Sequence, residues 1–174
     1  LIIISMIFWL LKNIISKNKK KFFQISINNF PFQIFILMIF IQIIMGAFVS
    51  GLDAGQIYQT WPLMGNSFFP NDLIFKNLSD LFELNNRSLV QFYHRAFAYF
   101  IILYSFFLVI FIYKNKLNEL YKPLKIVLFF LFLQSILGIL TLISGLNIYL
   151  ASFHQIISVL LIFSALNLYY LRAK

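Results

Sequence analysis

The chain has 174 residues, of which 61% are hydrophobic and 11% are charged. A soluble domain usually carries about 25% charged residues, so this composition excludes an ordinary soluble protein, and the absence of Cys excludes disulfide frameworks and thiolate metal sites. The net charge of +9 suggests a nucleic-acid partner at first sight, but the basic residues lie between apolar runs. We therefore expect no nucleic-acid binding.

The first apolar run covers residues 1–15 and is too short to span a membrane. It contains Lys12, and it has neither the basic start nor the small-residue cleavage site of a signal peptide. We expect residues 1–31 to be the tail of a truncated transmembrane helix followed by a basic linker. The chain is then the carboxy-terminal half of a longer protein.

Four further apolar runs approach the ~20 residues that cross a bilayer as a helix. The first follows Pro31 and stops before Gly51, residues that favour a helix start and a helix end. The sequence predicts an all-α integral membrane protein whose residues 32–174 form a four-helix bundle with a long outer loop at 51–89. The predicted spans are residues 32–50, 90–113, 124–144 and 148–171.

The charges between the spans predict the orientation in the membrane. Eleven Lys and Arg residues lie on one side and three on the other, whereas four of the five acidic residues lie on the second side. Because basic residues near span ends favour the cytoplasmic side, we expect the carboxy terminus in the cytoplasm or, in an organelle, in the matrix. The alternative is that the basic runs bind a soluble acidic partner. The eleven basic residues are Lys12, Lys17, Lys19, Lys20, Lys21, Lys114, Lys116, Lys122, Lys125, Arg172 and Lys174.

A weak internal repeat relates the two halves of the predicted bundle. The segment Gln42-Ile-Ile-Met-Gly46 has its counterpart in Gln134-Ser-Ile-Leu-Gly138. Each copy is followed, after an outer loop, by a helix with one His near its start. This pattern indicates a two-helix unit that is used twice, as in membrane proteins built from parallel repeats.

The only two histidines, His94 and His154, lie at matched depth in the predicted spans. At ~1.5 Å per residue both are roughly 6–9 Å below the outer surface, and Gly46 and Gly138 come at the same level. A layer of two His and two Gly leaves a flat space with a nitrogen ligand on either side. Haem iron takes two axial ligands, so we predict a haem between the histidines, with its edge against glycines that lack a side chain.

Each of these residues also has a simpler interpretation. An intramembrane His can hydrogen-bond a neighbouring helix, and Gly also serves plain helix packing. Gln42 and Gln134 lie one turn from the glycines, where they would bond the free ring nitrogens or pair across helices. Arg95 would pair with a haem propionate or extend toward the surface. The matched depth of the two histidines favours haem ligation.

Several segments resemble the carboxy-terminal half of haem A synthases, membrane enzymes that oxidise a methyl group of haem O to the formyl group of haem A. The resemblance covers roughly residues 42–155, and the lack of Cys is compatible with the mitochondrial and alphaproteobacterial branch. The matching segments are Gly46-Ala-Phe-Val-Ser-Gly-Leu-Asp-Ala-Gly55, Tyr58-Gln-Thr-Trp-Pro-Leu-Met64, Val90-Gln-Phe-Tyr-His-Arg95, Gln134-Ser-Ile-Leu-Gly-Ile-Leu-Thr141 and Leu150-Ala-Ser-Phe-His-Gln155.

The resemblance implies an eight-helix protein of two four-helix bundles, each with a His pair. It assigns a haem b cofactor to His94 and His154, and it places the haem O substrate and the oxidation in the amino-terminal bundle, which this chain lacks. The chain alone is then an inactive part of an oxidoreductase. Haem O synthase and electron-transfer proteins are the implied partners, and a bacterial plasma membrane or mitochondrial inner membrane is the implied location.

The sequence departs from the family at Tyr93, where relatives usually carry Asp, and residues 84–87 around Asn86 match the family's loop poorly. On the residues alone, two other classes stay open. One is a di-His b-type cytochrome that transfers electrons or handles quinone, and the other is a purely structural membrane subunit. A bound haem would exclude the structural subunit, and a second His pair with a Glu upstream of Leu1 would distinguish the synthase from the cytochrome.

Overall fold

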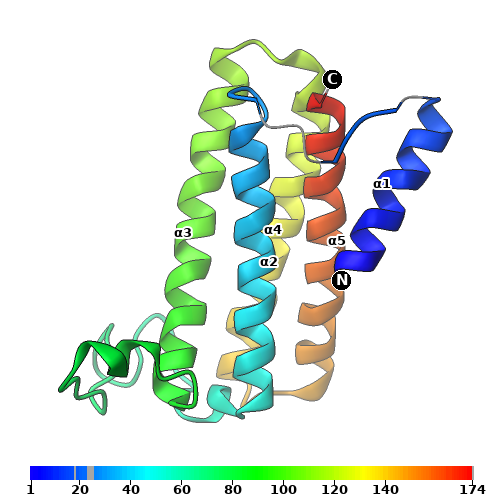
Figure 1. The fold of residues 1–174 in the computed structure, drawn as a ribbon. Helices are drawn as coiled ribbons and strands as arrows, with labels where there is room; N and C mark the ends of the chain where they lie inside the picture. Colours follow the sequence, from blue (N-terminus) through cyan, green and yellow to red (C-terminus); the bar gives the residue numbers. More distant parts are fainter. Residues whose placement is uncertain (18, 23–25, 174) are drawn as a thin grey trace.

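The computed structural model describes residues 1–17, 19–22 and 26–173, and most of these residues are helical (Figure 1). Lys174, one of the predicted basic residues, lies outside the described residues. The helices are α1 Ile2–Ser16, α2 Phe30–Gly51, α3 Arg87–Lys114, α4 Tyr121–Ile143 and α5 Ile148–Arg172, with short 3-10 helices η1 Ala54–Gln56, η2 Leu78–Phe82 and η3 Asn118–Leu120.

Helices α2 to α5 are long and apolar enough to cross a membrane, which confirms the four predicted spans. Local chemistry explains several of their ends. Pro31 lies in the first turn of α2, where its missing N–H breaks no helical hydrogen bond. Asn86 caps α3 by accepting from the Leu89 amide at 3.2 Å, and Asn147 caps α5 by accepting from the Tyr149 amide at 3.0 Å.

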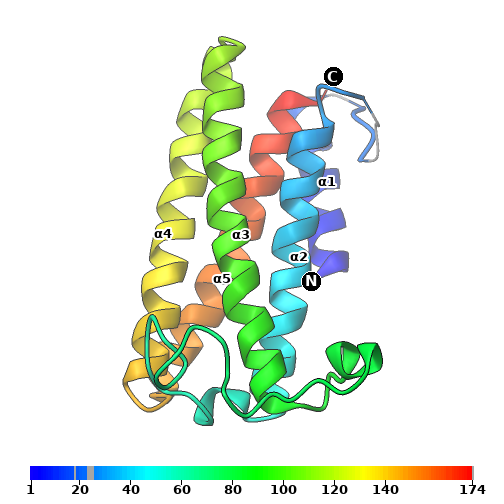
Figure 2. The ribbon, with the colours of Figure 1, turned by 90° about the vertical axis from the view of Figure 1, so that its left-hand side faces the viewer.

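The four long helices form two antiparallel hairpins, α2 with α3 and α4 with α5 (Figures 1 and 2). Contacts between α2 and α5 join the hairpins into one bundle. The shorter helix α1 lies outside the bundle and packs against α5 (Figure 1). The all-α four-helix bundle with an additional amino-terminal helix is therefore confirmed.

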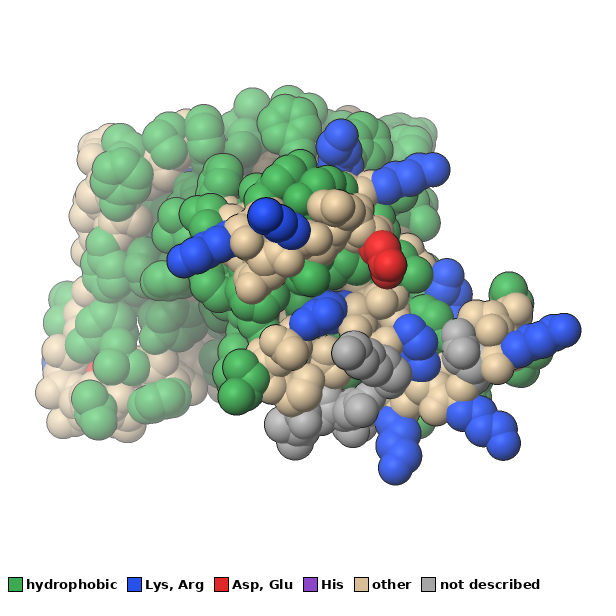
Figure 3. Space-filling model, turned by 90° about the horizontal axis from the view of Figure 1, so that it is seen from above, with side chains coloured by type: hydrophobic (Ala, Val, Ile, Leu, Met, Phe, Trp, Pro, Cys, Tyr) green, Lys and Arg blue, Asp and Glu red, His purple; other side chains and the backbone are tan. Residues whose placement is uncertain are grey.

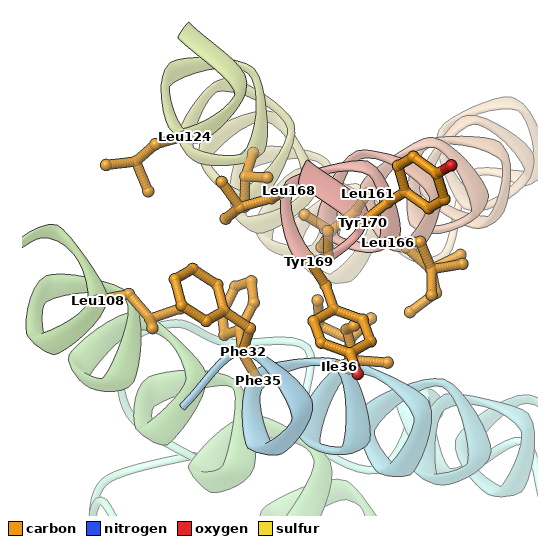
Figure 4. Close-up of a cluster of buried hydrophobic side chains, with 14 of the residues drawn as sticks. Phe32, Phe35, Ile36, Leu108, Leu124, Leu161, Leu166, Leu168, Tyr169 and Tyr170 are labelled. Atoms are coloured by element: carbon orange, nitrogen blue, oxygen red, sulfur yellow. The ribbon is translucent and has the colours of Figure 1, made fainter. Parts of the chain in front are cut away.

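One end of the bundle, where α2 begins and α5 ends, has a densely packed apolar core (Figure 4). Phe35 of α2 stacks on Tyr104 of α3 with ring centroids 6.2 Å apart. Tyr169 of α5 is buried in this core, and its hydroxyl accepts from Gln33 Nε2 and donates to the Phe22 carbonyl, each at 2.8 Å. Aromatic rings and the tyrosine hydroxyl group thus hold the two hairpins together at this end.

Polar contacts at the same end attach α1 to α5. The indole of Trp9 is buried against the rings of Tyr169 and Tyr170, and its Nε1 donates to the Lys20 carbonyl at 2.9 Å. Lys20 Nζ donates to the carbonyl of Tyr170 at 3.1 Å, and Ser16 Oγ lies 2.5 Å from the Tyr170 hydroxyl. The helix α1 is therefore docked onto the bundle through specific residues.

Lys and Arg side chains gather around this packed end, as Figure 3 shows in the view along the bundle. The predicted basic end of the bundle is thus present in the fold. The side of the membrane on which this end lies stays a prediction that rests on the positive-inside rule.

The opposite end of the bundle is packed differently. In α2 beyond Ile39, in α4 beyond Leu131 and in α5 before Leu161, no described residue is buried. In α3, the buried residues before Ile101 are confined to positions 88–91, which the long loop contacts. The helices at this end enclose no apolar core of their own.

Candidate functional site

His94 lies in the third turn of α3, in the less densely packed half of the bundle, and faces α2. A Cβ added to Gly46 would come within 3.2 Å of His94 Cε1, so the imidazole occupies the space that a side chain at position 46 would need. One turn earlier on α2, Gln42 Nε2 lies 3.2 Å from His94 Nδ1 and donates to the His94 carbonyl at 3.0 Å. Helix α2 thus contacts the ring through the Gln42 amide and leaves space for it at Gly46, which has no side chain.

His154 occupies the corresponding place in the second hairpin, on α5 facing α4. A Cβ added to Gly138 would lie only 2.9 Å from His154 Cε1. Gln134 Nε2 lies 3.2 Å from His154 Nε2, and His154 Nδ1 lies 3.1 Å from the main-chain oxygen of Gln134. A carbonyl oxygen only accepts, so the hydrogen is on Nδ1 and Nε2 carries a lone pair.

The structure brings together the predicted Gln, Gly and His within each hairpin. Each glutamine side chain lies at a ring nitrogen of its histidine, but Gln134 contacts Nε2 of His154, the nitrogen with the lone pair, while the main-chain oxygen of Gln134 bonds Nδ1. The glycines make room for the imidazoles themselves, whereas the sequence predicted that they make room for a porphyrin edge. Contact between the glycines and a porphyrin edge stays a prediction.

Arg95 follows His94 on α3 and points into the outer loop. Its Nη2 donates to the carbonyls of Pro62 at 2.8 Å and Leu63 at 3.2 Å. Its Nη1 is buried and has no hydrogen-bond partner among the described residues. A guanidinium whose Nη1 still has N–H groups to donate can bind a carboxylate. The binding of a haem propionate by Arg95 stays a prediction.

Three polar side chains on one face of α3 hold the outer loop in place. Arg87 donates to the carbonyl of Asp53 at 2.7 Å, and Gln91 donates to that of Tyr58 at 2.8 Å. Arg95 continues the series with its bonds to the next part of the loop. Positions 87, 91 and 95 are four residues apart and so lie on one helix face. The segment 53–63 therefore runs along the first turns of α3.

A second network ties the loop to α3 through Asp72. Its carboxylate accepts from the Tyr58 hydroxyl at 2.5 Å and from Ser88 Oγ at 2.6 Å. Burial raises the pKa of Asp72, but the bonds from Ser88 and Tyr58 outweigh it and hold that pKa below the ordinary 3.8. The hydrogen bond to Asp72, with some burial, raises the pKa of Tyr58 above 10.0. The ionised carboxylate is thus the form that holds the loop.

The same loop also reaches the second hairpin. A Cβ on Gly55 would lie 2.8 Å from Leu146 Cδ2 in the turn between α4 and α5, and the side chain of Gln59 approaches Gly145 in that turn. Segment 53–63 therefore connects α3 with the α4–α5 turn at the end of the bundle that carries the histidines (Figure 2). This role of the loop was not predicted from the sequence, and the four-residue spacing of Arg87, Gln91 and Arg95 is the signal that indicates it.

The residues at this end fit a haem. The surrounding helix residues are not buried, and the buried oxygens Gln42 Oε1 and Gln134 Oε1 have no partner among the described residues. His154 Nε2 carries the lone pair that iron requires. No three His, Asp or Glu side chains converge in the described part of the chain. Two imidazoles nevertheless suffice for a haem, because the porphyrin supplies the other four ligands.

Comparison with known proteins gives a consistent result. Residues 1–166 match the COX15-CtaA family, which is described as a cytochrome oxidase assembly protein. The chain is 45% identical over 170 residues to the haem A synthase of Pelagibacter ubique, an alignment that covers 94% of this chain and 47% of that protein. It is 42% identical over 142 residues to the haem A synthase of Wolbachia pipientis wMel, covering 81% of this chain and 39% of that protein.

A third relative, the haem A synthase of Rickettsia prowazekii, is 36% identical over 136 residues, which cover 78% of this chain and 40% of that protein. No solved structure matches the chain. The chain spans about half the length of the curated relatives that it matches.

Proposed function

The chain belongs to the COX15-CtaA family of cytochrome oxidase assembly proteins, and we propose that it is the haem b-binding carboxy-terminal bundle of a haem A synthase. In the proposed whole protein, the methyl group of haem O is oxidised to the formyl group of haem A. The amino-terminal bundle binds the haem O substrate, while residues 32–174 hold a haem b. Haem O synthase and an electron-transfer protein are the proposed partners.

The observation that carries this proposal is the repeated Gln–Gly–His unit at the less densely packed end of the bundle. In each hairpin an imidazole lies against a glycine and contacts a glutamine from the preceding helix. Two intramembrane histidines in equivalent positions, next to helices without a local buried core, are suited to bind one flat ligand from both sides. A purely structural subunit has no need for this arrangement.

The roles of the chain's own residues follow from their positions. His94 and His154 bind the iron, and Gly46 and Gly138 let the imidazoles approach the neighbouring helices. Arg95 binds a propionate through its unpartnered Nη1, while the outer loop covers the site and limits access of water. When bound, the haem supplies one-electron redox chemistry, for which the axial ligands and their hydrogen bonds set the potential.

The predicted location is a bacterial plasma membrane or a mitochondrial inner membrane, with the carboxy terminus on the cytoplasmic or matrix side. This proposal is supported by the basic residues at the densely packed end of the bundle (Figure 3). A di-His b-type cytochrome that only transfers electrons would use the same ligands, but family membership favours the synthase.

Spectroscopy of the purified chain tests the haem site. We expect the low-spin spectrum of a bis-imidazole haem, and we expect His94→Ala and His154→Ala each to abolish it because neither variant supplies two axial imidazoles. A matched control is Asn167→Ala, which changes a polar side chain of α5 in the densely packed half. A full low-spin spectrum in either His variant would contradict the paired ligation.

An activity assay tests the assignment of this half. Cells that express only residues 1–174 should accumulate no haem A from haem O, although the purified chain binds haem b. The physical reason is that the proposed substrate site and its histidines belong to the other bundle. Haem A formed by residues 1–174 in a strain without its own haem A synthase would show that this bundle performs the oxidation.

A further inference from the structure

The two histidines are equivalent in the repeat, but the neighbouring helices hold them differently. His154 Nδ1 donates to a main-chain oxygen, that of Gln134, at 3.1 Å. His94 has no such partner among the described residues, because both of its ring nitrogens face the side-chain amide of Gln42, at 3.2 Å and 3.5 Å. One ring is therefore positioned by the backbone and the other by a side chain.

The backbone contact prepares His154 for ligation. The Gln134 carbonyl belongs to helix α4 and cannot rotate, so it fixes both the tautomer and the direction of the ring. Gly138 allows the close approach, since a Cβ there would lie 2.9 Å from the ring. The hydrogen-bonding group that lies at the Nε2 lone pair is the flexible Gln134 amide, whose own oxygen has no partner in the described chain. That amide can turn aside when a ligand arrives.

The contacts of His94 fix neither tautomer nor direction. Gln42 Nε2 is a donor, so it satisfies whichever ring nitrogen carries the lone pair and leaves the ring N–H without an acceptor in the described part of the structure. The same amide nitrogen also donates to the His94 carbonyl at 3.0 Å. For Gln42 Oε1 to accept from the ring, the amide has to rotate and give up that bond. The fit against Gly46 is also looser, at 3.2 Å.

We propose that His154 is the anchoring ligand of the haem and that His94 is the exchangeable one. The coordination position on the His94 side then opens to small external ligands, such as carbon monoxide or imidazole, while the haem stays attached through His154. This inference rests on the proposed haem site and adds that its two histidine ligands differ in how readily they leave the iron. In it, Gln42 is a positioning residue that sets how readily His94 leaves the iron.

The two His variants of the full 174-residue chain give the first test, with haem content measured separately from inserted protein. His94→Ala should keep its haem as a five-coordinate high-spin species that binds carbon monoxide, and added imidazole should restore the low-spin spectrum. His154→Ala should lose the haem. Equal haem retention in both variants, or retention by His154→Ala alone, would overturn the proposal.

The glutamines give a matched second test that leaves both ligands in place and decides the matter if both His variants lose haem. Gln42→Leu removes the side-chain amide that positions His94, and it should speed carbon monoxide binding to the ferrous protein by about tenfold, the lower end of the effect of losing a residue that supports a metal ligand. Gln134→Leu should leave this rate unchanged, because the main-chain bond to His154 remains. Equal rates in the two variants, or a larger effect at Gln134, would overturn the inequivalence.

The wild-type chain separates this inference from the haem site itself. If the wild-type chain bound no haem, the proposed function would fail and with it the order of the ligands. If the wild type showed a low-spin haem and the variants behaved alike, the haem site would stand and only the order of its ligands would be refuted.

Discussion

The two ends of this bundle differ in how many side chains they bury, although the same four helices form both. At the end where α5 finishes, aromatic and aliphatic side chains bury one another, and α1 is attached through Trp9 and Tyr170. At the histidine end the helices bury no residues between Ile39 and Gly51 of α2 or along the matching parts of α4 and α5. Backbone hydrogen bonds within a transmembrane helix are satisfied without neighbours, so one packed end can hold the fold while the other accommodates a ligand.

This comparison predicts that packing mutations act mainly at the densely packed end. Tyr169→Ala removes a side chain that is 1% exposed, together with its bonds to Gln33 and Phe22. We expect a loss of about 3 kcal/mol in the free energy of unfolding, the low end for emptying a buried aromatic site, because lipid is as apolar as the core. Thermal unfolding in detergent measures it.

The matched control is Phe153→Ala on the same helix, where the ring is 58% exposed at the histidine end. We expect a change within about 0.5 kcal/mol, as for a substitution outside a packed core. Equal destabilisation by the two variants would mean that the histidine end contributes as much to stability as the buried core does.

Bulk at the glycines should produce the reverse pattern, in which the fold survives and the ligand is lost. In Gly138→Leu and Gly46→Leu, the new side chain would take the space of the imidazole, whose Cε1 lies 2.9 Å or 3.2 Å from an added Cβ. The displaced histidine no longer faces the iron, so we expect haem content to fall about tenfold or more, as when the support of a metal ligand is removed. Haem occupancy and inserted protein are measured separately.

Gly51→Leu is the control, since a Cβ at Gly51 meets nothing within 4 Å at the end of the same helix α2. It should keep full haem content. Normal haem content in both Gly46→Leu and Gly138→Leu would show that the two glycines serve helix contacts alone. The predicted layer of two His and two Gly would then have to be abandoned.

The sequence was sufficient to predict the helices and the pairing of each histidine with a glycine of the preceding helix. Apolar runs bounded by Pro31, by Gly51 and by basic residues fix the spans, because the bilayer sets their length. The rise of a helix then places His94 and His154 with Gly46 and Gly138. Each of these inferences depends only on the position of a residue along one helix.

The contacts that the sequence did not predict depend on the approach of one segment to another. Nothing in the sequence distinguishes a glycine that admits an imidazole from one that admits a porphyrin. The loop contacts of Arg87, Gln91 and Arg95 go to main-chain carbonyls, which every loop residue offers, so the sequence does not reveal which carbonyls are chosen. The docking of Trp9 onto α5 is hidden for the same reason, since its hydrogen-bond acceptor is the Lys20 carbonyl.

The smallest expected effect concerns how firmly the outer loop is attached at the histidine end of the bundle, and it depends on pH. Because the pKa of Asp72 is lowered in the folded protein, its contribution is complete above the ordinary carboxyl pKa of 3.8 and disappears as the pH falls through the lower folded value. Tyr58, whose pKa is raised, keeps its proton and its bond up to pH values near 10 and above. Hydrogen exchange of the loop amides, corrected for the intrinsic pH dependence, should therefore show constant protection at neutral pH and a modest loss below about pH 4.

Asp72→Asn separates this effect from general acid unfolding. The amide oxygen still accepts from Ser88 or Tyr58 but carries no charge, so the variant should show slightly weaker loop protection at neutral pH and no further loss on acidification until the whole bundle unfolds. The effect is small because Asp72 is exposed to solvent and because Gln91 still binds the Tyr58 carbonyl. An identical acid transition in the wild type and in Asp72→Asn would show that another group holds the loop at this end of the bundle.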